Sequence, residues 1–173
     1  MRIDVTKNPQ ENILALLIDA NPGLTITLAQ FNIAAPVAAD DGAARNSTVV
    51  LTAVPNAGFA GDVTITYNRL PLDVNVVNVP ASVQILGDDD ETSAGTKVAA
   101  ALGLVPGEYT TADFTAPVNE DTPGTITLAP VVDSLLYVGG PVVMPLTIAD
   151  ADIPMATAVA ATEMNGFDPA TTA

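Results

Sequence analysis

Residues 48–67 read TVVLTAVPNAGFAGDVTITY and hold two β-branched segments on either side of a turn sequence. In Thr48–Val54 and Val63–Tyr67, threonine, valine and isoleucine dominate, which is typical of strands. Between them, residues 55–61 contain a proline, an asparagine and two glycines, which favour a turn. The stretch therefore predicts a β-hairpin, and a less regular strand is expected over Phe31–Val37.

A helix is predicted ahead of the hairpin, over Pro9–Ala20. Asn8 can act as its N-cap, a proline at the first helical position needs no N–H, and Glu11 stands at the capping-box position. Apolar residues at positions 13, 14, 17 and 18 form one stripe along this helix. The sequence Asn-Pro-Gly at residues 21–23 favours an abrupt end.

The same order of elements recurs in the second half of the chain. Five residues around the first helix match later ones at a constant offset of 84: Leu14, Leu17, Ile18, Pro22 and Gly23 match Val98, Ala101, Leu102, Pro106 and Gly107. The strand sequence at 48–51 then resembles that at 125–128, and residues 59–61 (FAG) resemble residues 137–139 (YVG). Because the matches keep their order, we predict an internal duplication.

These patterns predict an α+β fold of two tandem helix-plus-antiparallel-β units, β-rich and sandwich-like, with a short C-terminal helical arm. Residues 1–86 are expected to hold the first helix/β-hairpin repeat plus a linker strand. Residues 87–148 are expected to hold the second, degenerate repeat, and residues 149–173 the C-terminal arm. The linker, Leu72–Leu86, is rich in valine and is interpreted as strand-forming.

The second repeat contains several residues that disfavour regular structure. Gly95 and Gly103 are each expected to weaken its helix by about 1 kcal/mol relative to alanine. A threonine or a serine at 92–93 is expected to cap that helix. Pro141 and Pro145 flank the last strand, which should therefore lie at a sheet edge or carry a bulge.

Five Lys and Arg against twenty Asp and Glu give a net charge of −15. Phosphate backbones and anionic membranes are bound by Lys and Arg, so the composition excludes direct nucleic-acid and membrane-surface binding. The apolar run at residues 13–18 is too short for a signal-peptide core, and we expect synthesis and assembly in a cytoplasm. The negative charge either keeps the surface solvated or attracts a basic partner or cations.

The chain contains no Cys, no His and no Trp. This excludes disulfides, thiolate chemistry, the usual zinc sites and every histidine-based triad. Paired carboxylates alone can hydrolyse a glycosidic bond, but the aromatic content of 4% offers few side chains to grip a sugar. We therefore expect no enzymatic activity, no catalytic residue, no cofactor and no small-molecule substrate.

The densest group of carboxylates is the run Asp88–Glu91. An EF-hand loop needs ligands at alternate positions and a glycine at the sixth, where this sequence has Ser93. We expect no built metal site, and two interpretations stay open: a solvated acidic loop, or adventitious binding of calcium.

An aromatic ring, an amide and a guanidinium meet in residues 67–70, YNRL. Tyr and Arg are enriched among interface hot spots, so Tyr67 and Arg69 are candidate interface residues. The alternative is that this segment only ends a hairpin strand, with Tyr67 half-buried and Arg69 paired with a local acid.

The C-terminal segment, residues 149–173, lies outside both repeats and predicts a short helix. Four apolar residues make it a second candidate interface: Met155, Val159, Met164 and Phe167. A helix of about 10 residues is marginal unless it packs on something. It packs either on its own chain or on a neighbouring subunit.

The sequence resembles virion structural proteins of giant (jumbo) tailed bacteriophages. The resemblance rests on the Thr-Val-Val-Leu-Thr strand, the Gly-Phe-x-Gly turn and the Thr-Ile-Thr-Tyr-Asn-Arg-Leu segment, followed later by Leu-Leu-Tyr-Val-Gly. It covers Asn12–Leu72 and, more loosely, Thr96–Ile148. The resemblance implies a particle component without enzymatic activity.

From these observations we expect a non-enzymatic structural component of a bacteriophage virion, assembled in the host bacterial cytoplasm. The expected place is that of a minor or decorating capsid protein, with other virion proteins and possible further copies of itself as partners. A tail, collar or baseplate protein is the first alternative. An adhesin-like β-domain that binds glycans or a host surface is the second.

Overall fold

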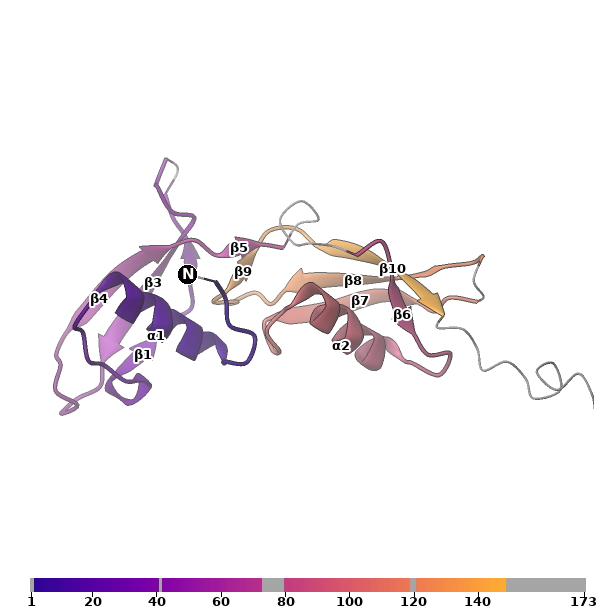
Figure 1. Ribbon diagram of the computed structural model, residues 1–173. Helices are drawn as coiled ribbons and strands as arrows, with labels where there is room; N and C mark the ends of the chain where they lie inside the picture. Colours follow the sequence, from indigo (N-terminus) through magenta and orange to yellow (C-terminus); the bar gives the residue numbers. More distant parts are fainter. Residues whose placement is uncertain (1, 41, 73–79, 119–120, 149–173) are drawn as a thin grey trace, which may run out of the picture.

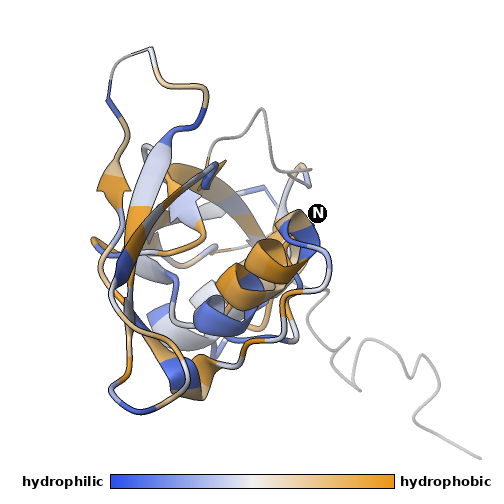
Figure 2. Ribbon diagram, turned by 90° about the vertical axis from the view of Figure 1, so that its left-hand side faces the viewer, coloured by the Kyte–Doolittle hydropathy of each residue, from blue (hydrophilic) through white to orange (hydrophobic). Residues whose placement is uncertain are grey.

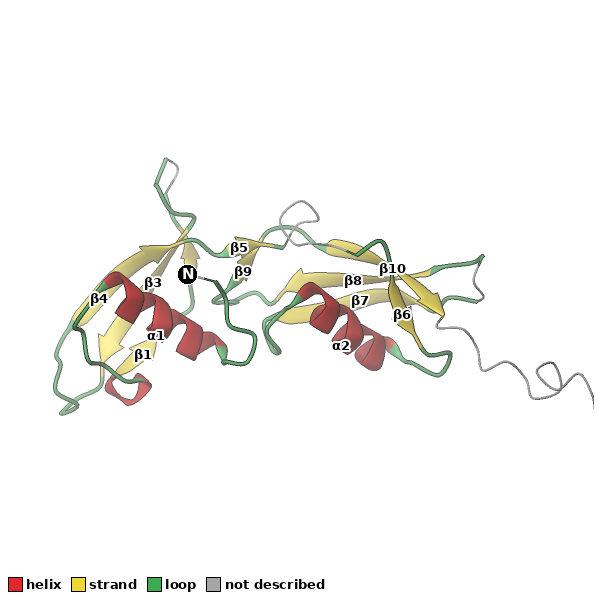
Figure 3. Ribbon diagram, in the orientation of Figure 1, coloured by secondary structure: helices red, strands yellow, loops and turns green. Residues whose placement is uncertain are grey.

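The computed structural model describes residues 2–40, 42–72, 80–118 and 121–148. Two units, each with one helix and one main sheet, follow one another along the chain and lie side by side (Figure 1). In the view of Figure 3 both helices lie in front of their strands and run in similar directions. The predicted α+β, β-rich class is confirmed, and no sheet of the described residues closes into a barrel.

The first unit contains one α-helix, a 3₁₀ turn and four strands. In chain order they are α1 (Pro9–Ala20), η1 (Leu28–Gln30), β1 (Phe31–Ile33), β2 (Val37–Ala38), β3 (Ser47–Ala53) and β4 (Asp62–Tyr67). β3 is the central strand: β4 pairs along one edge, while β1 and β2 pair with different parts of the other, all antiparallel. The predicted hairpin is therefore confirmed. The strand predicted over Phe31–Val37 is instead two short strands, interrupted where the sequence has Pro36.

Helix α1 begins and ends as predicted. The Asn8 side chain accepts a hydrogen bond from the Glu11 N–H at 2.8 Å, and Glu11 Oε2 accepts one from the Asn8 N–H at 2.8 Å. This reciprocal pair satisfies two backbone donors that the first turn leaves free. The helix presents Ile13, which is 1% exposed, to the strands. Figure 2 shows hydrophobic residues, in orange, on this helix and on the strands of the same unit.

The second unit repeats the pattern, and its four-stranded sheet includes β6 (Val83–Ile85), which precedes the helix. Its main elements are β6 (Val83–Ile85), α2 (Glu91–Leu102), β7 (Tyr109–Thr115), β8 (Gly124–Pro130) and β10 (Val142–Ile148). The strand order is β6-β10-β8-β7, with β6 parallel to β10 and the other pairs antiparallel. Of the predicted linker, residues 73–79 lie outside the described residues, and β6 pairs within the second sheet.

Two sequence expectations about the second helix are wrong in detail, and a third residue has a role that was not expected. Its N-cap is Asp90, not Thr92 or Ser93, and Ser93 fills the reciprocal position of the capping box. Gly103 does not weaken the helix, because it is the C-cap and has φ of 65°, in the left-handed region that favours glycine. Gly95 lets the helix approach β7, where a methyl group in its place would overlap Thr111 Cγ2.

The prolines of the last strand lie where the sheet is open on one side. Pro145 pairs with Thr125 of β8, whereas β6 pairs only with the residues from Leu146 onward. Over its first half β10 is therefore an edge strand among the described residues, as the prolines predicted. The bulge of this sheet lies instead in β7, near Asp113, whose φ is 52°.

The hydrophobic core lies mainly in the second unit. Among the described residues, only four of its members precede Val83: Ile13, Val49, Tyr67 and Leu72. The centre of the second unit is formed by side chains that are fully enclosed, such as Ile126, Leu128, Met144 and Leu146. The first unit therefore contributes fewer buried residues to this common core than the second unit does.

Candidate functional site at the junction of the two units

The chain segment that leaves the first unit becomes a strand on the second. β5 (Leu70–Pro71) pairs in parallel with β9 (Tyr137–Val138), which lies in the loop between β8 and β10 (Figure 1). The Leu70 N–H donates to the Leu136 carbonyl oxygen at 2.8 Å, and the Leu72 N–H donates to the Val138 carbonyl oxygen at 2.7 Å. Leu72 is 1% exposed and joins the common core.

Arg69 binds both units from a buried position. Its guanidinium donates through Nε to Ser47 Oγ at 2.7 Å and through Nη1 to the Ser134 carbonyl oxygen at 3.1 Å. Asn46 holds its backbone, because Asn46 Oδ1 accepts from the Arg69 N–H at 2.8 Å and Asn46 Nδ2 donates to the Arg69 carbonyl oxygen at 2.7 Å. The cation thereby ties β3 of the first unit to the β8–β10 loop of the second.

A buried carboxylate organises the other side of the junction. Glu108 accepts hydrogen bonds from Ser134 Oγ and, at 2.9 Å, from the Leu136 N–H. Ser134 Oγ in turn accepts from the Tyr137 N–H at 2.9 Å. Ser134 thus connects the carboxylate of Glu108 to the guanidinium of Arg69. Among the described residues, no buried side-chain nitrogen or oxygen lacks a hydrogen-bond partner.

Two tyrosines complete the junction. The Tyr67 hydroxyl donates to the Leu135 carbonyl oxygen at 2.8 Å, and the Tyr137 hydroxyl accepts from the Val105 N–H at 3.1 Å. Burial raises the pKa of Tyr67 to about 12; Arg69 opposes this shift and Glu108 adds to it. Burial also raises the pKa of Tyr137. Both phenols stay protonated at neutral pH, so they act here as hydrogen-bonding groups and not as nucleophiles or bases.

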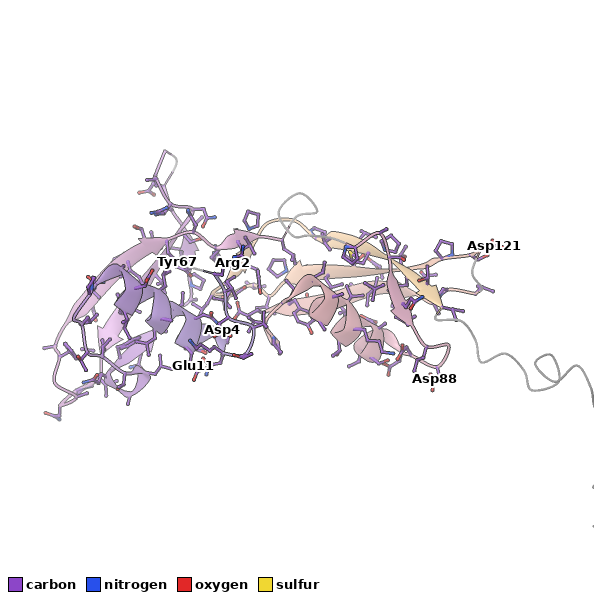
Figure 4. The ribbon with its side chains drawn as sticks, in the orientation of Figure 1. Arg2, Asp4, Glu11, Tyr67, Asp88 and Asp121 are labelled. Carbon is purple, nitrogen blue, oxygen red and sulfur yellow. The ribbon has the colours of Figure 1, made fainter. Side chains whose placement is uncertain are left out.

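The structure places the first pair of predicted interface residues inside the chain. Figure 4 labels Tyr67 on the side of the first unit that faces the second. Tyr67 and Arg69 are 5% and 8% exposed, so Tyr67 is not half-buried, and Arg69 is bound by two serines, not by a local acid. Both contact the second unit of their own chain. The other four predicted interface residues, Met155, Val159, Met164 and Phe167, lie outside the described residues, as does the whole predicted arm.

Sequence reasoning missed Glu108, Ser47 and Ser134 as members of this network. The signal for Ser134 was weak but present, because it precedes the apolar sequence Leu-Leu-Tyr-Val, in which a polar residue needs a partner. Glu108 follows a Pro-Gly turn like any solvated acid. Only its packing against residues from a distant loop reveals its role.

Two grooves flank the described fold. The junction groove has a volume of about 770 Å³, and Arg2, Asn46, Asn68 and Gly103 are among its lining residues. An apolar groove of about 250 Å³ lies at the opposite end of the first unit, between the end of α1 and the β3–β4 loop. Leu17, Leu24, Ile26, Phe59 and Val63 are among its lining residues, and we call it the apolar groove. Sequence reasoning read Phe59 only as part of a turn.

The acidic run at 88–91 stabilises the start of α2. Asp89 accepts from the Leu86 N–H at 2.6 Å and pairs with Lys97, and Asp90 caps the helix. The bond from Lys97 holds the pKa of Asp89 below its usual range, and the Ser93 N–H does the same for the pKa of Asp90. In the part of the chain that the structure describes, no group of three or more metal-ligating residues comes together.

Neither of the described helices is both long enough and apolar enough to cross a lipid bilayer.

Comparison with known proteins gives one match. No curated protein and no solved structure matches the chain. One protein-family model matches residues 3–172, which span both units and most of the C-terminal segment. The chain therefore belongs to a family of unknown function (DUF7941).

Proposed function

We propose that the protein is a non-enzymatic structural component of a bacteriophage virion, a minor or decorating capsid protein that acts through protein–protein assembly. The observation that carries this proposal is the locked junction. The buried Arg69 joins the two units through Ser47 and Ser134, and Glu108 holds the second unit's side of the junction in place through Ser134 and Leu136. Arg69 borders the junction groove, but its guanidinium is already bound to Ser47 and Ser134, whereas an active site leaves such a group free to bind the substrate.

The surface supports a role in protein contacts. Exposed apolar residues occur on both units, including Val37 and Phe59 on the first and Val132 and Val143 on the second. Of these, Phe59 belongs to the apolar groove, and an apolar surface of this kind is typical of sites that other proteins cover. The net charge of −15 keeps such a subunit soluble before assembly, and favours partners that present basic patches.

The aromatic residues disfavour a glycan-binding role. Sugar-binding surfaces present exposed aromatic rings, whereas Tyr67 and Tyr137 are buried inside the junction. Among the described aromatic side chains, Phe59 alone is largely exposed, and it lies in the apolar groove. The adhesin-like alternative therefore has less support than assembly.

Mass spectrometry of purified particles from the producing phage tests the proposal. We expect peptides of this chain at a fixed copy number that survives stringent purification. Labelling of the protein in electron micrographs then decides between the capsid and the tail, collar or baseplate. Absence from purified particles, with the protein present in the infected cell, would contradict a structural role.

Deletion of residues 150–173 tests the predicted arm. Since the described fold ends at Ile148, we expect the shortened chain to fold but to be missing from particles. A matched variant, Val132→Ala, changes a side chain that is 95% exposed and should enter particles normally. Normal incorporation of the shortened chain would show that the arm does not hold the protein in the particle.

A further inference from the structure

The two units follow the same path through space, so their positions can be paired. After each helix, a Pro-Gly turn is closed by a backbone bond, from the Leu24 N–H to the Asn21 carbonyl oxygen at 3.0 Å and from the Glu108 N–H to the Val105 carbonyl oxygen at 3.3 Å. Gly23 has φ of 93° and Gly107 of 83°, as the third residue of a type II turn requires. Leu24 and Glu108 are therefore equivalent.

The strands give the same pairing. β3 and β8 have seven residues each and bury the first, third and fifth, so Leu51 is equivalent to Leu128. Leu51 pairs with Val63 of β4, and Leu128 pairs with Val142 of β10. Counted from these pairs, β4 and β10 are equivalent strands. The residue two positions after β4, Arg69, then corresponds to Ile148 at the end of β10.

The loops between these strands differ in what covers them. In the β8–β10 loop, Tyr137 is 1% exposed because the first unit covers it, through β5 and the side chains of the junction. In the β3–β4 loop, the matching residue Phe59 is 43% exposed and forms part of the apolar groove. An apolar cavity of about 150 Å³ accepts a benzene ring, so a groove of about 250 Å³ has room for one or two apolar side chains.

The residues at the two free ends of the molecule form a complementary pair, as the residues at the junction do. At the junction, the cation Arg69 leaves the first unit and meets the network of Glu108 on the second. At the free ends, the residue equivalent to Arg69 is the apolar Ile148, and the residue equivalent to Glu108 is the apolar Leu24. A polar pair inside the chain is thus replaced by an apolar pair at its two ends.

We infer that copies of this protein associate head to tail. The end of the second unit in one copy, Ile148 and the segment that follows it, binds the apolar groove of the first unit in the next copy. This contact repeats between copies the contact that β5 and Arg69 make within one chain. It goes beyond the proposed function, because it needs only two copies of this chain and no other component of a particle.

Such a contact joins two different surfaces, so it generates a closed ring or an open filament. The charge distribution sets its salt dependence. Residues 1–86 carry four basic and seven acidic side chains, and residues 87–173 carry one and thirteen, so both ends are negative. Salt screens this repulsion while leaving the apolar contact intact, and we expect association to increase with ionic strength.

Disulfide trapping in the full-length chain tests the inference, because the natural chain has no cysteine. Two single variants, Ala60→Cys in the lining of the groove and Ala151→Cys after β10, are mixed and mildly oxidised. We expect a covalent dimer in the mixture at a yield at least tenfold above that of a control mixture. The control replaces Ala60→Cys by Ala112→Cys, an exposed alanine on β7 away from the groove.

The double variant, Ala60→Cys with Ala151→Cys, identifies the occupant of the groove. Head-to-tail contact predicts covalent oligomers of two or more chains on a non-reducing gel. A single-chain product with an internal disulfide would show that the segment binds the groove of its own chain and would overturn the inference. Equal dimer yields in the test and control mixtures would also overturn it.

Sedimentation of the natural chain and of two single variants, all without cysteine, gives an independent measurement of self-association. Phe59→Asp should weaken self-association at least tenfold, while circular dichroism shows a native fold, because Phe59 is already 43% exposed. Val143→Asp, at a residue 56% exposed on β10, should leave association unchanged. A monomeric wild-type chain at high concentration and high salt would contradict the inference.

Discussion

The β3–β4 and β8–β10 loops have related sequences and equivalent places in their units, yet Phe59 is 43% exposed and Tyr137 is 1% exposed. The difference does not arise inside the loops. It arises because the first unit lies on the second loop, whereas in the described residues nothing lies on the first. The comparison shows that burial in a tandem fold is set by the neighbouring unit.

Replacement of the two matching aromatic residues by alanine should reveal the largest difference between the loops in unfolding free energy. We expect Tyr137→Ala to cost about 4 kcal/mol of unfolding free energy, because it leaves a cavity in the core. Phe59→Ala should cost less than about 1 kcal/mol, because much of its ring is already in water. Urea denaturation of both variants measures the difference. Equal costs would mean that Phe59 is buried in solution and that the comparison fails.

Removal of the cation at the junction should have the next largest effect. Arg69→Met keeps an apolar stem but removes the hydrogen bonds to Ser47 and Ser134, and we expect a loss of about 3 kcal/mol. Arg45→Met, at an exposed arginine of the same unit, should change stability by less than about 0.5 kcal/mol. Thermal or urea unfolding of both measures the effect. A similar small change in both variants would show that the junction contributes little.

The two units also differ in the residue that their helix presents to the sheet. α2 has Gly95 where α1, counted from its N-cap, has Ile13. Gly95→Ala should destabilise the protein by about 1 to 2 kcal/mol, because the clash with Thr111 exceeds the gain of about 1 kcal/mol in helix propensity. In a Thr111→Ser background, which lacks Cγ2, the same change should be neutral or stabilising. A stabilising Gly95→Ala in the natural background would contradict the close approach.

The two helix caps should differ in their pH dependence, with the smallest effect of the series. Asn8→Ala and Asp90→Ala should each destabilise the folded chain at pH 7, because each removes the side chain that caps its helix. The pKa of Asp90 is lowered in the folded chain, so its contribution is complete above the unfolded pKa of about 3.9 and is lost as pH falls through the lower folded value.

Thermal unfolding at pH 7 and pH 3 measures this difference between the caps. The gap between Asp90→Ala and the natural chain should shrink at pH 3. The Asn8→Ala gap should change less, since an amide does not titrate. A constant Asp90 gap would mean that its carboxylate is not what caps α2.

The features that the sequence predicted correctly are those that depend on residues close together in the chain. The capping box of α1, the Asn-Pro-Gly stop and the β3–β4 hairpin follow from neighbouring residues whose hydrogen bonds close within a few positions. The second helix was predicted too, but its cap was misplaced because Asp90, Thr92 and Ser93 can all accept the first N–H groups.

The candidate site was predicted only in part. Tyr67 and Arg69 were singled out as interface residues, or else as residues that only end a hairpin strand; the structure buries both against the second unit of their own chain. Their partners Ser134 and Leu135 lie more than 60 residues away in sequence. No periodicity links residues that far apart, so their contact depends on how the two units dock.

The sequence by itself determined the α+β class, the order of helix and strands in each unit, and the chain's exclusion from cysteine and histidine chemistry, because these depend on composition and short-range pattern. Tertiary structure alone decided which of two similar loops became core, why Gly95 is a packing residue, and where the buried charges of Arg69 and Glu108 find partners. Desolvation is the physical reason: a buried polar group is stable only where distant parts of the chain supply its hydrogen bonds, and only the folded chain brings them together.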